Sequence, residues 1–321
     1  MEKDGLGTLI SKQSIPWSLL IIALVAFPAT ATGQDRGKWT IRTPLPSPRT
    51  EVAAAQLEGK IFVVGGLGRS GNLFEEFDPG KNTWRRRASL PRPLHHVGAA
   101  AIGGKIYVIS GYLSGRGPVD TVYVYDPSAD KWQTRTPMPT ARGALTVGII
   151  GGKIYAVGGV GTNKKNSSAN EAYDPVTDRW TKHSPIPTPR DHLAAGVIGG
   201  RLYAIGGRVD GSHAKHLTVN EEYDPALNRW RKRTPMPTRR SGITAASLGG
   251  KVFVFGGEAN WRTLNLTEIY DPGSDSWSTG AVMPTARHGF GVAILGQEIY
   301  VISGGPKAGA TYSSVNEVFT P

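Results

Sequence analysis

The chain has 321 residues, with 37 Lys and Arg against 25 Asp and Glu and a formal net charge of +12. It contains no cysteine, which excludes disulfides, thiolate metal sites and a thiol nucleophile. The positive charge admits a polyanionic partner. However, many of the cations flank tryptophans in what we predict to be outermost strands, where basic side chains discourage edge-to-edge aggregation. We therefore expect no nucleic-acid partner.

The first 33 residues differ from the rest of the chain. Two lysines precede an apolar run over residues 19–27, and small residues 29–33 follow it. This pattern predicts a secretory signal peptide cleaved after the small residues. An uncleaved anchor is the alternative, but the apolar run is shorter than the roughly 20 residues that a spanning helix needs. We expect a secreted or periplasmic protein made of residues 34–321, without membrane contact after cleavage.

One unit repeats through the remainder of the chain. Residues 151–159 show its pattern: a glycine pair, a short apolar strand with one aromatic, and a second glycine pair. The early pair suits a tight hairpin turn, and the late pair ends the strand where the backbone must turn. Six copies follow one another at intervals of 45 to 50 residues, which is typical of a solenoid or propeller. The aromatics of the six copies are Phe62, Tyr107, Tyr155, Tyr203, Phe253 and Tyr300.

Each repeat contains four runs of strand length. In the first repeat they are residues 52–57, 60–64, 73–77 and 83–87. Four strands per repeat, without helical periodicity, predict an all-β, six-bladed β-propeller with four-stranded antiparallel blades. The first run is rich in alanine and glycine, which suits innermost strands crowded around an axis.

The two ends of the predicted propeller complete one blade. The chain stops at residue 321 after the third strand of the last repeat, while an orphan tryptophan strand around Trp39 precedes the first repeat. We predict that this N-terminal strand joins the last blade and closes the ring, which removes open sheet edges.

Length variation is confined to one stretch per repeat. From the first late glycine, or the serine that replaces it, to the next aromatic-Asp-Pro turn, the spacing varies from 12 to 17 residues, whereas the other spacings are constant. In a repeat array such insertions lie on one face, which is often the binding face.

These residues resemble the Kelch-repeat family. The late Gly-Gly, the downstream tyrosine and tryptophan, and Pro-Met-Pro-Thr-Ala-Arg at 137–142 carry the resemblance, which covers residues 38–321. Departures are Ser110 and Ser303 in the glycine pairs, Leu94 in place of arginine, and Thr320 in place of aspartate. Kelch propellers include protein-binding adaptors, copper radical oxidases, and exported sugar mutarotases similar to the N-acetylneuraminate epimerases, so the resemblance implies one of these functions. The oxidase is excluded because its cofactor needs a cysteine crosslinked to tyrosine.

The candidate site lies beside an arginine that recurs in five repeats. In ligand-binding Kelch domains this position resembles the rim of the central cavity. We predict that the arginines line it, although they could instead satisfy backbone carbonyls between blades: Arg49, Arg142, Arg190, Arg240 and Arg287. Irregular ionisable residues next to them are candidate ligand contacts, although the histidines could instead cap strands: Glu51, His95, His96, Asp191, His192 and His288.

Two functions follow from this site. The first is a monomeric, non-catalytic module without a cofactor that binds a protein, peptide or glycan. The second is a mutarotase or epimerase for an acidic sugar such as N-acetylneuraminate, in which the arginines hold the carboxylate and Glu51 with His96 or His192 moves protons.

A metal bound by the rim histidines is a third possibility. The imidazoles come from alternate blades, and a wide channel mouth would keep them beyond the roughly 2.0–2.1 Å ligand distance. We therefore expect no metal.

Overall fold

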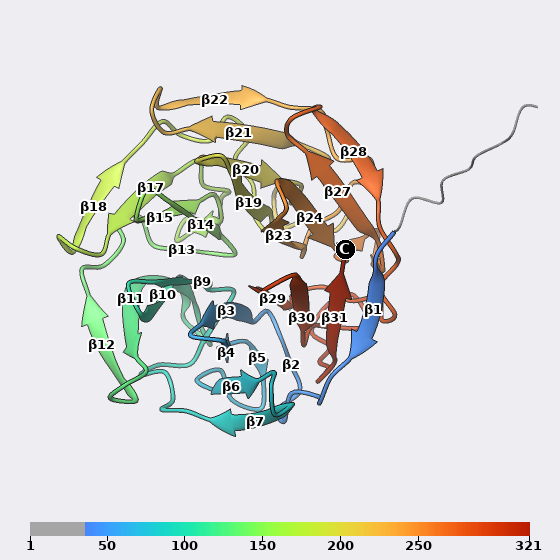
Figure 1. The fold of residues 1–321 in the computed structure, drawn as a ribbon. Helices are drawn as coiled ribbons and strands as arrows, with labels where there is room; N and C mark the ends of the chain where they lie inside the picture. Colours follow the sequence, from blue (N-terminus) through green and yellow to red (C-terminus); the bar gives the residue numbers. More distant parts are fainter. Residues whose placement is uncertain (1–35) are drawn as a thin grey trace, which may run out of the picture. The chain divides into compact units, whose positions relative to one another are not determined.

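The computed structural model describes residues 36–321, so the predicted signal peptide lies outside the described residues. Asp35–Pro321 form one compact unit. Figure 1 shows six small sheets arranged around a central axis, as the repeat predicts. Within residues 36–321, no helix is long and apolar enough to cross a membrane.

Five blades follow the chain from the innermost to the outermost strand. Blade 1 contains β3 (Ala53–Leu57), β4 (Lys60–Val64), β6 (Phe74–Asp78) and β7 (Thr83–Arg86). Blade 2 contains β9 (Gly98–Ile102), β10 (Lys105–Leu113), β11 (Gly117–Asp126) and β12 (Lys131–Arg135). Blade 3 contains β14 (Thr146–Ile150), β15 (Lys153–Val157), β17 (Asn170–Asp174) and β18 (Arg179–Lys182). Blade 4 contains β19 (Ala194–Ile198), β20 (Arg201–Ile205), β21 (Asn220–Asp224) and β22 (Arg229–Lys232). Blade 5 contains β23 (Thr244–Leu248), β24 (Lys251–Phe255), β27 (Thr267–Asp271) and β28 (Ser276–Thr279).

Blade 6 closes the ring as predicted. Its strands are β29 (Gly291–Leu295), β30 (Glu298–Ile302), β31 (Asn316–Thr320) and, outermost, β1 (Lys38–Ile41). β1 pairs antiparallel with β31, with Trp39 opposite Phe319. The two ends of the described chain therefore share one sheet, which is visible at the right of Figure 1.

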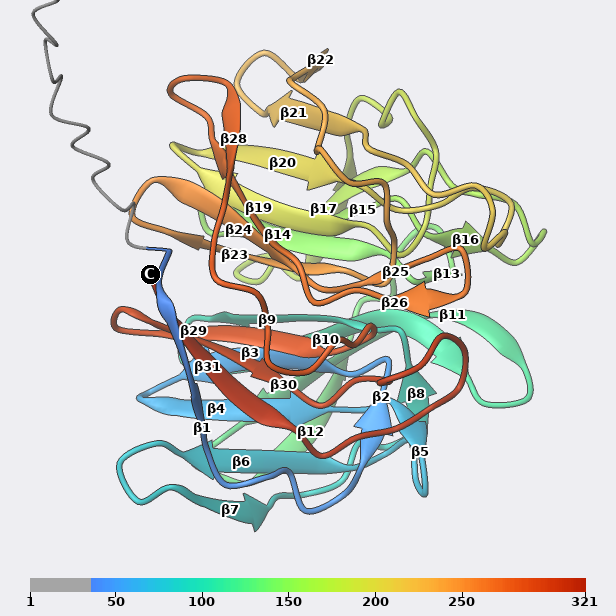
Figure 2. The same ribbon diagram turned by 90° about the vertical axis from the view of Figure 1, so that its right-hand side faces the viewer.

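The two faces of the propeller differ in their connections. All hairpin turns within the blades that carry Gly-Gly or Asp-Pro lie on one face, which we call the hairpin face. The variable stretches lie on the opposite face, here called the loop face, at the right of Figure 2. It carries seven further short strands: β2 (Arg49–Thr50), β5 (Leu67–Gly68), β8 (Leu94–His95), β13 (Arg142–Gly143), β16 (Val160–Gly161), β25 (Glu258–Ala259) and β26 (Arg262–Thr263).

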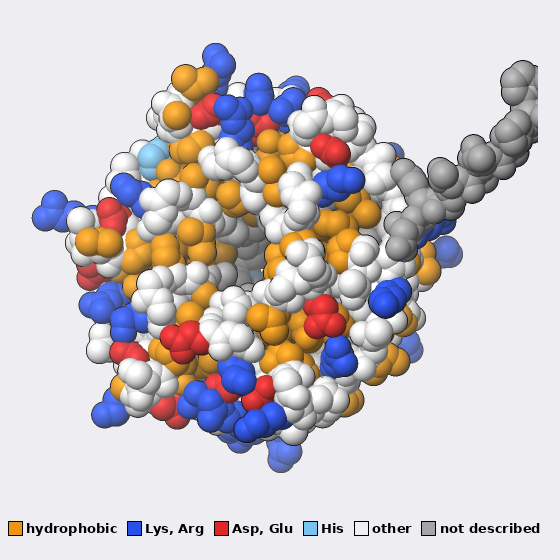
Figure 3. Space-filling model, viewed as in Figure 1, with side chains coloured by type: hydrophobic (Ala, Val, Ile, Leu, Met, Phe, Trp, Pro, Cys, Tyr) orange, Lys and Arg blue, Asp and Glu red, His pale blue; other side chains and the backbone are white. Residues whose placement is uncertain are grey.

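The hairpin face carries its cations on the perimeter. Figure 3 shows apolar side chains around a central hollow, with Lys and Arg gathered toward the outside. Arg85 and Arg87, beside the outermost strand β7, both bind Glu76. Arg231 and Arg233 repeat this arrangement with Glu222. The prediction that these cations decorate outer edges is confirmed.

The repeated aromatics join neighbouring blades. Tyr173 is fully buried, and its ring lies 5.2 Å from that of Trp180 opposite it on β18. The indole Nε1 of Trp180 donates to the carbonyl of Thr136, 3.0 Å away in the preceding segment. Because each repeat satisfies polar groups of its predecessor in this way, the blades form one continuous core.

The five repeated arginines do not line the cavity, and this part of the prediction is wrong. Their side chains are fully buried: Arg49, Arg142, Arg190, Arg240 and Arg287. Arg190, for example, donates to Glu221 Oε2 at 2.6 Å and to the carbonyls of Ala204 and Gly206 at 2.8 Å. A fully buried guanidinium that is paired with a glutamate and with carbonyls inside a blade is not accessible to a ligand in the channel. The alternative that these arginines satisfy backbone carbonyls is confirmed.

Candidate functional site

A ring of backbone hydrogen bonds surrounds the axis on the loop face. In blades 2 to 6, the residue two positions after the arginine, or after Leu94 in blade 2, donates its N–H to the equivalent residue of the preceding blade. The bonds of the ring are His96 to Glu51, Ala144 to His96, His192 to Ala144, Gly242 to His192 and Gly289 to Gly242, at 3.0 to 3.1 Å. Val52 closes the ring by donating to Gly289 at 3.3 Å. The six residues therefore mark the channel mouth.

All six ring positions have a left-handed backbone. Glycine, which adopts it without penalty, occurs at 242 and 289. Glu51, His96 and His192 adopt it with φ of 55°, 56° and 52°. A side chain costs about 1–2 kcal/mol in this conformation, so glycine would fold more easily at these three positions. The observation points to a use for the side chains.

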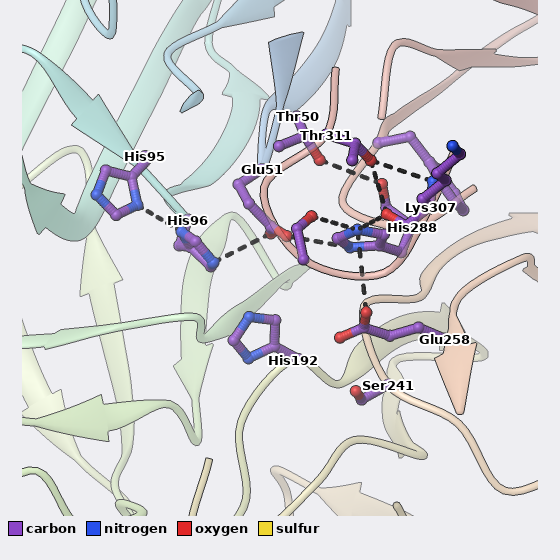
Figure 4. Close-up of polar contacts among 12 residues, drawn as sticks. Thr50, Glu51, His95, His96, His192, Ser241, Glu258, His288, Lys307 and Thr311 are labelled. Atoms are coloured by element: carbon purple, nitrogen blue, oxygen red, sulfur yellow. Dashed lines mark hydrogen bonds and ion pairs between the residues drawn. The ribbon is translucent and has the colours of Figure 1, made fainter. Parts of the chain in front are cut away.

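Glu51, His96 and His192 meet at the mouth of a cavity. The cavity has a volume of about 190 Å³ and is lined by the innermost strands of all six blades. The rings of His96 and His192 lie 4.9 Å apart, and Glu51 Oε2 lies 3.2 Å from His96 Nε2. Figure 4 shows the three side chains pointing toward one another from three separate blades. This part of the predicted rim is assembled as the sequence suggested.

Glu51 also contacts His288. Glu51 Oε1 lies 3.3 Å from His288 Nδ1, and His288 Nε2 lies 3.2 and 3.1 Å from the carbonyls of Lys307 and Gly309. Burial would lower the pKa of His288, but the hydrogen bond and charge of Glu51 raise it to about 9. Burial would raise the pKa of Glu51, but the hydrogen bond and positive charge of His288 hold it well below its usual value. The two residues therefore form a buried ion pair.

His96 is neutral. Burial lowers the pKa of His96 to about 3, which outweighs the opposite effect of Glu51. Its Nδ1 lies 2.5 Å from Nδ1 of His95, so one of the two nitrogens donates to the other. The ring of Tyr112 stacks on His95, with centroids 5.4 Å apart, and burial raises the pKa of this phenol to about 12. His95 thus contacts Nδ1 of His96, whereas Glu51 contacts Nε2 of the same ring.

Asp191 and His192 form the other side of the mouth. Asp191 Oδ1 lies 2.5 Å from His192 Nδ1, and Asn166 donates to Asp191 Oδ2 at 2.5 Å. Arg208 Nη2 lies 3.3 Å from His192 Nε2, and Arg208 Nη1 donates to Glu258 Oε1 at 2.8 Å. The mouth therefore combines carboxylates, imidazoles and one guanidinium within hydrogen-bonding distance of one another.

Comparison with known proteins identifies the scaffold. Residues 30–207 and 146–320 match the family described as the KLHDC2/KLHL20/DRC7 Kelch-repeats domain. The chain belongs to the Kelch-repeat family. A solved structure described as "Structure of YjhT" is similar in fold, with 18% sequence identity, a TM-score of 0.77, and coverage of 86% of this chain and 96% of the other. Among curated proteins, the comparison found no match.

Several residues at the mouth of this Kelch propeller were not predicted from the sequence. They come from the variable stretches after the late glycines: Tyr112, Arg208, His213, His216 and Glu258. His213 Nδ1 lies 3.4 Å from Glu258 Oε1, and His216 Nδ1 lies 3.1 Å from Ser241 Oγ. The available signal was the histidine content of the stretch from 207 to 219, which contains two of the seven histidines.

The opposite end of the channel in this Kelch propeller is apolar. A cavity of about 380 Å³ opens there between alanine and valine side chains such as Ala100, Val147 and Val197. Gln56 and Ser247 are its polar lining side chains among the described residues. Ionisable chemistry is therefore concentrated at the loop-face end of the channel.

Proposed function

We propose that the protein is an exported binding module that takes a protein, peptide or glycan ligand on its loop face. In this proposal a polar group of the ligand reaches the channel mouth. The apolar run at 19–27 supports export to a secreted or periplasmic location. Neither a cofactor nor a second copy of the chain is needed for this function.

One observation carries the proposal: an exposed aromatic is connected to the channel mouth. Trp261 lies between β25 and β26 with 69% of its surface exposed, and its ring stacks on His213 at a centroid distance of 4.0 Å. His213 contacts Glu258, which binds Arg208 beside His192. The exposed ring of Trp261 is therefore connected by a series of side-chain contacts to the polar groups at the channel mouth.

This arrangement suits a ligand with an apolar surface and a polar end. Tryptophan is enriched at interfaces because it buries a large rigid surface at little cost in conformational entropy. Trp261 is a non-glycine residue with φ of 62°, so its backbone is also in the costly left-handed region. Tyr312, 46% exposed, is a second loop-face aromatic. The aromatic face stacks on a peptide side chain or on the C–H face of a sugar ring.

Screening a glycan array and a peptide library with purified protein tests the proposal. Trp261→Ala should abolish or strongly weaken the best binder, and so should replacement of the loops at 112–119 and 164–169. Leu227→Ala is the matched control, because Leu227 is 63% exposed but lies in a turn on the hairpin face. Binding that survives all loop-face changes, with melting temperature unchanged, would place the ligand elsewhere and overturn the proposal.

An acid–base isomerase is the second candidate function. It is favoured by the 3.2 Å contact between ionised Glu51 and neutral His96, since a base and a neutral imidazole side by side can exchange protons with a sugar hydroxyl. The buried arginines cannot hold a substrate carboxylate, so Arg208, beside His192, is the candidate for that role. NMR exchange spectroscopy of N-acetylneuraminate and neutral sugars provides the test. Anomer exchange no faster than in buffer, for every sugar, would exclude this candidate.

A further inference from the structure

The closest set of ionisable side chains at the channel mouth has the composition of a metal site. Glu51, His96 and His192 each offer one ligand atom, and these atoms all lie within 4.8 Å of one another. Two imidazoles and a carboxylate are the protein ligands of catalytic zinc sites and of non-haem iron sites. Such sites leave one or more positions open for water or substrate.

The width expected of the channel mouth does not keep His96 and His192 apart. The channel mouth is narrow enough to bring their rings to 4.9 Å, although they come from alternate blades. His288 does not join them. It lies on the far side of Glu51, where its Nδ1 contacts Oε1 of that carboxylate. The third ligand is a carboxylate, not an imidazole.

Each candidate ligand is held by a second polar group. Asp191 Oδ1 lies 2.5 Å from His192 Nδ1, which leaves Nε2 of that imidazole directed away from the carboxylate. Metal-ligating histidines commonly donate their other nitrogen to a carboxylate in this way. His96 Nδ1 contacts His95, and Glu51 Oε1 contacts His288. The atoms left for a metal are therefore Glu51 Oε2, His96 Nε2 and His192 Nε2.

The backbone gives independent support. The three ligands occupy strained left-handed positions, as does Ala144 in blade 3, whereas blades 5 and 6 have glycine at the equivalent positions 242 and 289. Strain of this kind is concentrated at functional sites. Three of the four non-glycine positions of the ring therefore carry the candidate ligands.

Only a small adjustment is required. Tetrahedral ligands at 2.0–2.1 Å from zinc are separated by about 3.4 Å, so the widest pair must approach by at most about 1.4 Å in total. Arg208 Nη2, 3.3 Å from His192 Nε2, is the group that a metal would displace. Arg208 keeps Asp191 and Glu258 as partners when it does so.

We propose that Glu51, His96 and His192 bind one divalent first-row transition metal ion such as Zn²⁺, with an open position facing the channel. The site lies above the cavity of about 190 Å³, so the open position is accessible to a small ligand.

Metal titration of the full chain tests the proposal. Protein purified without a histidine tag and stripped with chelator should take up one equivalent of Zn²⁺ by calorimetry. Co²⁺ should give the intense visible absorption of a tetrahedral site. His96→Ala and His192→Ala should each lose this equivalent. His183→Ala should retain it, because His183 is the histidine remote from the channel and packs against Tyr155.

Two further variants keep the test decisive. Glu51→Gln retains the size of the side chain, so loss of the equivalent in a variant with unchanged melting supports ligation by the carboxylate. Asp191→Asn should reduce affinity by about 10–100-fold while retaining the stoichiometry, as expected for a positioning residue. Absence of the Zn²⁺ equivalent and of the Co²⁺ absorption in the folded wild type would overturn the proposal. Retention of both in His96→Ala and His192→Ala would do the same.

Discussion

Leu94 and Tyr123 occupy, in blade 2, the two positions that hold a buried arginine and glutamate in the other five blades. Both are buried, with 1% and 4% of their surface exposed, and both belong to one apolar cluster. The two charges are thus replaced together, so neither is left unpaired. The pattern indicates that the Arg–Glu pair is a unit of blade structure that an apolar pair can replace.

This replacement predicts a result in blade 4. Glu221→Gln leaves the buried charge of Arg190 without its partner, and we expect it to reduce the free energy of unfolding by about 3–5 kcal/mol. The double variant Arg190→Leu/Glu221→Tyr, which copies blade 2, should recover most of that loss. Urea unfolding of the wild type, Arg190→Leu, Glu221→Tyr and the double variant measures the coupling.

The control for this cycle is an exposed ion pair. Lys153 lies 3.6 Å from Asp174 with 43% of its side chain exposed, so Lys153→Ala should change stability by less than about 1 kcal/mol. If the loss of unfolding free energy in the double variant equals the sum of the losses in the two single variants, a Leu–Tyr pair like that of blade 2 does not replace the Arg–Glu pair of blade 4.

The architecture could be predicted because its signals are local. Residues 60–64 were predicted as a strand from one apolar run between glycines, and β4 has the same bounds. Closure by the strand around Trp39 followed from an orphan tryptophan strand before the first repeat and the lack of one after the last repeat. Such features need no knowledge of side-chain direction, because hairpin turns fix the order of strands in each blade.

The site could be predicted only in part. Equivalent repeat positions approach one axis, which is why Glu51, His96 and His192 were found from spacing. Arg208 and Glu258 were missed, because the path of a variable loop is not encoded in the repeat. The arginines were misplaced because a side chain next to the mouth can point into the blade, and the sequence does not show which way.

Closure of the ring predicts that β1 is required for stability. A chain starting at residue 36 retains β1, whereas one starting at 42 loses Trp39, whose ring lies 5.1 Å from Phe319 and 5.7 Å from Phe255. We expect the shorter chain to lose about 3 kcal/mol or more, a fall in melting temperature of roughly 6–12 °C. Equal melting of the two chains would show that β31 is stable as an edge strand.

The Glu51–His288 pair predicts how stability depends on pH. The folded pKa of His288, raised to about 9, lies above the ordinary value near 6.5. The folded state therefore binds this proton more tightly, so the stabilisation is complete below pH 6.5 and is lost as pH rises through 9. The expected loss is about 3 kcal/mol. Unfolding by urea between pH 6 and 10, in chelator, measures it.

Glu51→Gln is the comparison for this titration. Without the carboxylate charge, the pKa of His288 should fall because burial then dominates, and the decrease of stability above pH 6.5 should become shallower. Glu258 also faces His288, at 3.9 Å, and stays in place in this variant. An unchanged pH profile would mean that Glu51 does not hold the proton on His288.

Arg208 should compete with a metal at His192. Its guanidinium lies 3.3 Å from the nitrogen that would bind the ion, and it carries a positive charge. Arg208→Gln removes both the contact and the charge, so we expect affinity for Zn²⁺ to rise about tenfold or more. The reason is that like charges a few ångströms apart repel by more than 1 kcal/mol in a partly buried site.

Lys215→Gln is the control: this cation lies in the same loop but is 58% exposed and pairs with Asp210. Competition with a chromophoric chelator measures both variants. A lower affinity in Arg208→Gln would show that Arg208 positions Asp191 and His192 for the metal, and that its charge is the smaller effect.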